Sequence, residues 1–248
     1  MNVTAIKTRI IEANSCTLTD LLDKSLTDVR ENSVIAITSK IVALCEGNVA
    51  SQNEYEKDEL IEKEADLFIP KSQNPYGVYL TIKNSMLIPS AGIDASNSNG
   101  YYVMWPKDPQ ASAKQCWDFI RKRFNIEHLG VIITDSTTTP LRWGVTGKSI
   151  AYCGFKPLDT KIGKPDLFGR ILRETRINIA DALAASAVLV MGEADEQTPI
   201  AILENLPFVE FLDHSPSIDE VNALKIDMTR DLYAHLLTNA KWQSPKKG

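Results

Sequence analysis

Three short stretches of the sequence end an apolar run with an acidic residue beside glycine or a hydroxyl residue. They are residues 91–97 with Asp94, residues 133–136 with Asp135, and residues 190–195 with Glu193. Hard divalent cations such as Mg²⁺ take oxygen ligands, usually one or two carboxylates, with water and substrate phosphates completing the octahedron. Three carboxylates gathered at the ends of strands and helices would therefore suit one or two such ions.

Each carboxylate also has a simpler interpretation. Asp94 could close an Asx-turn, Asp135 could cap the turn that follows it, and Glu193 could end a helix in water. Spacing alone favours these three separate explanations, so the metal-site hypothesis needs support from elsewhere in the sequence.

Another stretch, residues 142–149 (RWGVTGKS), is one letter short of a phosphate-binding P-loop. That motif needs Gly, four residues and then Gly-Lys-Ser or Gly-Lys-Thr, placed directly after a strand and opening a helix. Arg142 stands where the first glycine should be, and Gly154 and Pro157 leave too little chain for a helix. We therefore predict that Lys148 is not a P-loop lysine and that any phosphate site lies elsewhere.

Helical and strand-like signals are interleaved along the whole chain, which indicates an α/β or α+β class. Short apolar, β-branched runs predict strands at 34–38, 77–82, 101–105 and 131–134, with a long polar loop at 89–100. Helical spacing predicts a helix capped by Thr17 or Thr19, an exposed charged helix at 54–67, and amphipathic helices at 112–124 and about 175–190.

The bulk composition narrows the class of protein. A chain of 248 residues that is 44% hydrophobic can form one large domain or two intimately packed ones. The net charge of −5, with no basic stripe, argues against a nucleic-acid partner. No apolar run approaches the roughly 20 residues of a membrane span, and the start lacks a signal-peptide layout, so we expect a cytoplasmic protein without a membrane partner. The cysteines are dispersed and are expected to be reduced, small buried side chains, namely Cys16, Cys45, Cys116 and Cys153.

Four longer motifs, in the same order along the chain, carry a resemblance to a known family. They are SAGIDASN around Asp94, ITDS followed by PLRWG, PDLFGR at 165–170, and ADALAASAVLVMGEADEQTP at 180–199. From TSK at Thr38 onward the sequence resembles the coenzyme F420-0:L-glutamate ligase family. The resemblance implies an α+β fold with mixed or antiparallel sheets and packed helices, and an intertwined homodimer. We accordingly expect one domain of this type at 1–243, or two closely packed subdomains, followed by a disordered tail at 244–248.

The resemblance also implies an enzyme, a γ-glutamyl ligase that uses GTP, or alternatively ATP, with two Mg²⁺ or Mn²⁺ ions. Such an enzyme attaches L-glutamate to the free carboxylate of a cofactor through an acyl phosphate. The metal ions neutralise charge on the transferring phosphoryl group and orient donor and acceptor, so the protein mainly positions the reactants.

Matching positions to the family motifs gives the expected site. Asp94 and Asp135 resemble ligands of one metal ion, and Ser136, where the family commonly has threonine, and Glu193 resemble ligands of a second. The expected nucleotide-binding residues are Thr8, Arg9, Ile10, Ile11, Ser39, Lys40, Asn97, Gly192 and Ala194. The expected catalytic residues are Asp94, Asp135 and Arg142. Arg142 would contact phosphate or the acceptor carboxylate, with a structural salt bridge to a nearby acid as the alternative. In the PDLFGR motif, Asp166 and Arg170 could form a separate structural ion pair.

The acceptor stays open at this point. The chain has Leu44 where family members often carry lysine, and three threonines at 137–139 where they often carry Gly-Arg. Losing these cations suggests a differently charged acceptor, and folate is the alternative to coenzyme F420-0.

Two other classes of function compete with the ligase. A non-catalytic nucleotide sensor would keep the fold, although an unused cluster of like charges raises the electrostatic cost of folding. A hydrolase with Ser136 as nucleophile would need one of three histidines, His128, His214 or His235, and the sequence has no G-x-S-x-G elbow.

Overall fold

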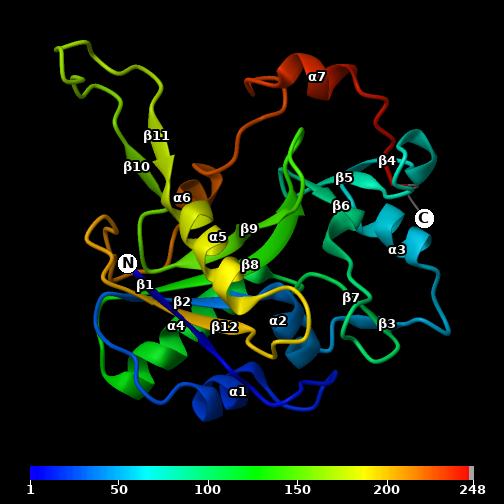
Figure 1. Ribbon diagram of the computed structural model, residues 1–248, viewed down its shortest axis with the longest axis horizontal. Coiled ribbons are helices and arrows are strands. Elements are labelled where there is room, and N and C mark those ends of the chain that lie inside the picture. The colour runs from blue at the N-terminus through cyan, green and yellow to red at the C-terminus, as the bar shows by residue number, and fades with distance from the viewer. Residues whose placement is uncertain (246–248) are drawn as a thin grey trace.

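A mixed five-stranded sheet forms the centre of the computed structural model, which describes residues 1–245 (Figure 1). Its strands lie in the order β1, β12, β2, β8, β9, and only β2 and β8 run parallel. Their bounds are Asn2–Ile6 for β1, Ile200–Glu204 for β12, Ser33–Thr38 for β2, Leu129–Thr138 for β8 and Val145–Cys153 for β9. The predicted α+β class with mixed sheets is confirmed.

Helices cover both faces of this sheet, which explains why β2 is an unbroken apolar run. Ile35 and Ile37 of β2 pack in one core with helices α1 (Leu18–Ser25), α2 (Ser39–Glu46) and α4 (Pro109–Phe124). Val34 and Ala36 point to the other face and pack against helix α5 (Ile179–Met191). A strand buried on both faces reads as continuous hydrophobic sequence rather than as alternation.

A smaller lobe follows α2 and holds a third hydrophobic cluster around Ile61, Phe68 and Ile93. It contains the two-stranded sheet of β3 (Val49–Ser51) and β7 (Tyr101–Val103), helix α3 (Lys57–Glu64), and the three-stranded sheet of β4 (Leu67–Ile69), β5 (Leu80–Lys83) and β6 (Met86–Pro89). Short 3₁₀ turns lie at Lys71–Gln73 and Ser90–Gly92. Because β6 contacts β8, this lobe lies directly against the main sheet.

Local capping corrects several predicted helix boundaries. Asp108 accepts a hydrogen bond from the amide of Ala111 at 3.0 Å, so α4 begins before the predicted residue 112. Asn178 caps α5, and the preceding residues form strand β11 (Arg176–Asn178) rather than the first turn of that helix. The charged helix predicted at 54–67 is only α3, because the chain turns into β4 after Ala65.

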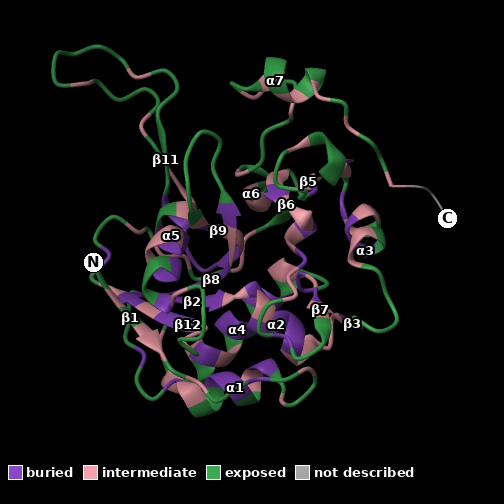
Figure 2. Ribbon diagram, turned by 45° about the vertical axis from the view of Figure 1, so that its right-hand side comes forward, coloured by how far each residue is buried: buried purple, intermediate pink, exposed green. Residues whose placement is uncertain are grey.

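A long arm leaves the body between β10 (Leu158–Thr160) and β11, and it is exposed along most of its length (Figure 2). The PDLFGR motif lies in this arm, where Leu167 and Phe168 are 98% and 96% exposed. The Asp166 carboxylate accepts hydrogen bonds from the amides of Phe168 and Arg170 at 2.8 and 2.9 Å. The expected Asp166–Arg170 ion pair is therefore wrong, because this carboxylate closes a turn through backbone amides and pairs with no cation in the described chain.

The RWGVTGKS stretch forms the tip and first strand residues of the β8–β9 hairpin, which confirms that it is not a P-loop. Gly144 takes φ +94 in the turn. A Cβ at Gly147 would lie 2.4 Å from the carbonyl oxygen of Ala184, so this glycine lets α5 pack directly on β9. Lys148 Nζ lies 2.9 Å from the Asp181 carboxylate on the first turn of α5. Both features serve helix packing rather than phosphate binding.

The C-terminal segment crosses the molecule and returns to the smaller lobe. It contains the short helices α6 (Ile218–Asn222) and α7 (Ala234–Asn239), and Gln243 exchanges two backbone hydrogen bonds with Phe68. Of the tail predicted at 244–248, Ser244 and Pro245 have no regular structure, and 246–248 lie outside the described residues.

All four cysteines are free, as predicted. Cys116 and Cys153 are buried, whereas Cys16 and Cys45 are only partly buried and their sulfurs lie 3.9 Å apart. Within residues 1–245, no helix has both the length and the apolar character that a membrane crossing requires.

Close packing at Gly147 gives a test of the α5–β9 contact. We expect Gly147→Val to lower the free energy of unfolding by about 3 kcal/mol, because the new side chain meets helix backbone that cannot move aside. Thr146→Val on the neighbouring position, which faces the other side of the sheet, should change it by less than about 0.5 kcal/mol. Urea unfolding of the two variants measures the difference, and equal stabilities would contradict the packing described here.

Candidate active site

A cavity of about 630 Å³ opens at the edge of the main sheet where β2 ends beside residues 134–136 of the parallel strand β8. Its walls come from the N-terminal segment, the start of α2, the loop after the 3₁₀ turn at Ser90–Gly92, strand β8, and the loop that follows α5. Segments far apart in the sequence therefore meet in one place.

Every residue predicted for the metal and nucleotide sites lines this cavity. These residues are Thr8, Arg9, Ile10, Ile11, Ser39, Lys40, Asp94, Asn97, Asp135, Ser136, Gly192, Glu193 and Ala194. Arg142 is not among the lining residues; it lies exposed in the β8–β9 turn and forms no ion pair within residues 1–245. A catalytic role for Arg142 stays a prediction without support from its position.

Parallel pairing of β2 with β8 explains how the two halves of the site meet. Thr38 is the register partner of Thr134, so Ser39 and Lys40, which begin α2, lie next to Asp135 and Ser136. The sequence suggested that Asp135 ends a strand, but β8 continues to Thr138. A register shift between Ile133 and Thr134 instead marks a bulge, a feature that re-aims side chains next to active sites.

Asp94 is held by both its backbone and its side chain. Its backbone forms a bridge to Val103, while its carboxylate accepts hydrogen bonds from the amide and hydroxyl of Ser96, each at 2.8 Å. The Asx-turn proposed as the simpler interpretation is therefore present. Lys40 Nζ also lies 2.6 Å from Asp94 Oδ2. Burial acts to raise the pKa of Asp94, but the Lys40 and Ser96 contacts outweigh it and hold the pKa below its usual value.

Asp135 lies deeper in the same wall. Burial raises the pKa of Asp135 to about 6, against the hydrogen bonds from Trp105 and from the Ser136 amide, and the negative charges of Asp94 and Glu193 add to the rise. The pKa of Glu193 is also raised, first by its loss of hydration and further by the charges of Asp94 and Glu196, which together outweigh the nearby Lys40 ammonium. The three carboxylates therefore share one electrostatic field although they come from three parts of the chain.

The donor atoms of this cavity suit a hard divalent cation. The carboxylates of Asp94, Asp135 and Glu193 and the hydroxyl of Ser136 are oxygen ligands, and neither histidine nor cysteine lines the described cavity. Within residues 1–245, no three His, Cys, Asp or Glu side chains are placed to hold one ion together. An ion bound here would thus take one or two protein ligands and complete its shell with water and phosphate, as Mg²⁺ does.

A hydrogen bond joins two loops that line the cavity, the loop that holds Asp94 and the loop that follows α5. Asn97 Nδ2 donates to the carbonyl oxygen of Ala194 at 2.7 Å, and the Ala194 amide donates to Glu196 at 2.8 Å. Gly192 has φ +82, a backbone conformation that residues with a Cβ rarely adopt, so a larger residue would strain this turn. The amide of Asn97 is engaged within the protein, and its contact to a nucleotide stays a prediction.

Sequence reasoning missed Trp105, Ser96 and Glu196, which hydrogen-bond to Asp135, to Asp94 and to the Ala194 amide. Ser96 could have been found, because Asp-x-Ser is a common Asx-turn sequence. Trp105 ends a stretch predicted as a strand and carries no motif, so only the fold brings its indole to Asp135.

Comparison with known proteins identifies the family. Residues 5–205 match the family described as F420-0:Gamma-glutamyl ligase. The chain belongs to this family. It is 34% identical over 207 residues to a coenzyme F420:L-glutamate ligase of Methanopyrus kandleri, covering 76% of this chain and 81% of that protein. A protein of the same name from Methanococcus maripaludis is 31% identical over 223 residues, covering 84% and 89%. Membership confirms the expected class of enzyme, a ligase that forms C–N bonds.

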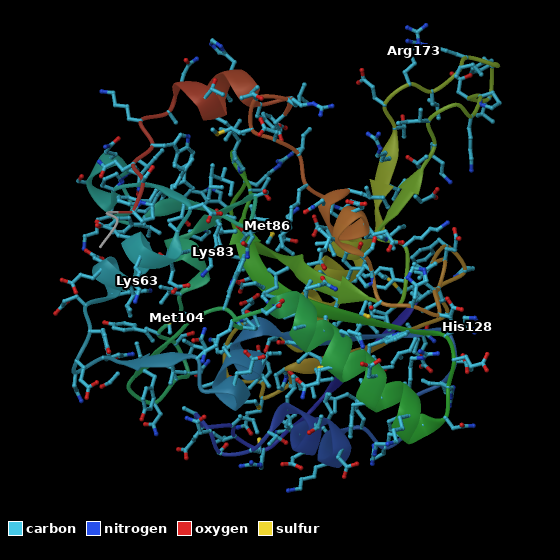
Figure 3. All side chains as sticks on the ribbon, turned by 180° about the vertical axis from the view of Figure 1, so that it is seen from behind. Lys63, Lys83, Met86, Met104, His128 and Arg173 are labelled. Atoms are coloured by element: carbon cyan, nitrogen blue, oxygen red, sulfur yellow. The ribbon has the colours of Figure 1, made fainter. Side chains whose placement is uncertain are left out.

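The serine hydrolase alternative finds no support in this geometry. None of the three histidines lines the cavity, so Ser136 lacks the histidine base that a serine hydrolase of this type needs. His128 directly precedes β8 and lies at the opposite end of the main sheet from Lys83 and Met104 (Figure 3), beside Glu31.

The Lys40–Asp94 ion pair allows a test of the electrostatic coupling between Lys40 and the carboxylates of the cavity. At low ionic strength without divalent cations, Lys40→Met should lower the free energy of unfolding by about 1 kcal/mol, because it leaves neighbouring carboxylates without compensation. Adding Asp94→Asn should recover much of that loss, which a double-mutant cycle measures. The exposed Lys114–Asp118 pair is the matched control and should show weaker coupling. Strict additivity at Lys40 and Asp94 would contradict the coupling.

Proposed function

We propose that the chain is a nucleoside-triphosphate-dependent γ-glutamyl ligase that joins L-glutamate to the free carboxylate of coenzyme F420-0. One observation carries the proposal: carboxylates from three distant segments share a single cavity with Lys40, in a chain whose relatives are named coenzyme F420:L-glutamate ligases. GTP is the proposed phosphoryl donor, with ATP as the alternative.

Asp94 and Asp135 would hold one Mg²⁺ or Mn²⁺ ion, and Ser136 and Glu193 a second. Such ions, when bound, neutralise charge on the triphosphate and align it with the acceptor. Lys40 would place a point charge beside the phosphates once its present partner Asp94 turns to an ion.

The proposed reaction has two steps. The acceptor carboxylate attacks the γ-phosphorus, the bond to the β-phosphate oxygen breaks, and an acyl phosphate and nucleoside diphosphate form. The amine of glutamate then attacks the acyl carbon, inorganic phosphate leaves, and the amine gives up its proton as the amide forms. Excluding water from the cavity while the substrates are bound would serve this chemistry, because water would hydrolyse the acyl phosphate.

We propose that the N-terminal residues 8–11, which line the cavity, contact the base of the nucleotide. The Thr8 amide donates to the carbonyl oxygen of Gln197 at 2.9 Å, which fixes this segment against the loop after α5. Ile11 is buried while Ile10 is 68% exposed at the cavity rim. An apolar rim of this kind suits a flat purine ring.

The region proposed to bind the acceptor, around Leu44 and residues 137–139, has fewer cationic side chains than the family resemblance implies. Leu44 is 2% exposed and lines the cavity, so no cation projects there. Thr137 is buried in β8, and Thr138 and Thr139 are exposed beside the hairpin turn. Coenzyme F420-0 is the proposed acceptor because the relatives are named for it, and a folate is the second candidate because of these lost cations.

An intertwined homodimer in the cytoplasm is part of the proposal. Large apolar side chains stand exposed on three segments, the β10–β11 arm, the β8–β9 turn and the C-terminal segment that contains α6 and α7. Examples are Leu141, Trp143, Leu167, Phe168 and Leu232, each at least 89% exposed. Exposed apolar surface of this extent is typical of an interface.

The proposed activity is tested by incubating the protein with labelled glutamate, Mg²⁺ or Mn²⁺, GTP or ATP, and either coenzyme F420-0 or a reduced folate. Mass spectrometry should detect the acceptor extended by glutamate, with GTP and coenzyme F420-0 giving the faster reaction. Product with folate alone would move the assignment to the second candidate. A folded protein that binds triphosphate but makes no product with any combination of nucleotide and acceptor would contradict the ligase proposal. That result would indicate a non-catalytic nucleotide sensor.

Removing single charges tests the metal ligands. We expect Asp94→Asn and Asp135→Asn each to reduce turnover at least about 100-fold, because each takes a ligand from the metal. Their loss of folding stability should be small. Asp135→Asn relieves repulsion with Asp94 and Glu193, whereas Asp94→Asn gives up a partly exposed pair with Lys40 that is worth at most about 1 kcal/mol. Asp118→Asn, on the exposed face of α4, is the control and should keep full activity. Near-native turnover in both cavity variants would show that the site is misplaced.

A further inference from the structure

The carboxylate of Asp135 is fixed on both of its oxygens. Trp105 Nε1 donates to Oδ2 at 2.5 Å, and the amide of Ser136 donates to Oδ1 at 2.9 Å. Two donors on two different oxygens set the plane of the carboxylate. The lone pairs that remain are those available to a ligand in the cavity.

The indole that makes this contact is itself held from several sides. Trp105 is 2% exposed, and its carbonyl oxygen accepts from Asn48 Nδ2 at 2.6 Å. A Cβ at Gly92 would lie 2.1 Å from Trp105 Nε1, so the glycine of the SAGIDASN motif is the only residue type that leaves room for the indole edge. The turn that presents Asp94 therefore packs directly on the indole that orients Asp135.

A buried cation lies over the same ring. Lys83 is 8% exposed, and its Nζ is 5.4 Å from the centroid of the Trp105 ring. Glu64 pairs with Lys83 at 2.8 Å. Lys83 lies where the smaller lobe meets the main sheet (Figure 3). A cation over the π face draws electron density from the indole and strengthens its N–H as a donor.

We propose that Trp105 is a positioning residue that orients the Asp135 carboxylate for a divalent cation. The inference rests on the proposed function, because it assigns Asp135 to a metal ion. Outer hydrogen-bond partners of this kind fix the orientation of a ligand, and losing one typically weakens metal binding about 10- to 100-fold. Trp105 touches neither metal nor substrate in this role and acts through Asp135 alone.

The test compares Trp105→Phe with Trp117→Phe. Trp117 is also buried, and its Nε1 donates to the carbonyl oxygen of Leu129 at 2.7 Å, away from the cavity. Both variants lose one indole donor and part of one ring, so general destabilisation affects both. Mn²⁺ binding by electron paramagnetic resonance, with no nucleotide present, should weaken at least about 10-fold in Trp105→Phe and by less than about 2-fold in Trp117→Phe.

A spectroscopic measurement on the unmutated protein covers the case in which Trp105→Phe does not fold. Titration with Mg²⁺ should shift the indole ¹H–¹⁵N signal of Trp105 and leave that of Trp117 in place. Mn²⁺ affinity in Trp105→Phe equal to that in Trp117→Phe, or an unmoved Trp105 signal in a protein that binds the ion, would overturn the positioning role while leaving the ligase intact. If the unmutated protein binds neither ion, the proposed metal site fails, and this inference falls with it.

Discussion

The parallel pairing of β2 with β8 is the constraint on which the site depends. It brings the first residues of α2 beside Asp135 and Ser136, because Thr38 and Thr134 are register partners and both strands run toward the same edge. Ligands in open sheets bind at such an edge, outside the carboxyl ends of parallel strands. Antiparallel pairing of these two strands would place Lys40 and Asp135 at opposite ends of the sheet.

The packing of α5 on one face of the main sheet positions the loop that contains Glu193. Helix α5 is rich in alanine and lies close to β9 at Gly147, so its C-terminal end reaches the cavity and presents Gly192 and Glu193. Lys148 anchors the start of the same helix through Asp181. The glycines and the lysine that resemble a phosphate-binding loop in the sequence therefore pack against, and pair with, the helix that leads to Glu193.

Apolar periodicity predicted strands β2 and β8 and the helices α4 and α5, because burial on one or both faces imposes a regular pattern. It did not predict β1, β9 or β12, which complete the main sheet. Boundaries set by single contacts, such as the Asp108 cap of α4, were displaced by a few residues. Family motifs located the carboxylates and Lys40, but no local signal placed Arg142 outside the cavity or Trp105 beside Asp135. Such placements depend on pairing between distant strands and on the close approach at Gly92, which a linear pattern does not encode.

The account requires that the raised pKa of Asp135 and the pairing of Asp94 with Lys40 reflect a cavity that is short of positive charge. Anomalous diffraction from crystals soaked in Mn²⁺ with a non-hydrolysable triphosphate tests this requirement most directly. The account predicts manganese peaks within ligand distance of Asp94 and Asp135 and of Ser136 and Glu193, with the phosphates beside Lys40. Manganese and phosphates bound elsewhere, with this cavity holding only water, would contradict it.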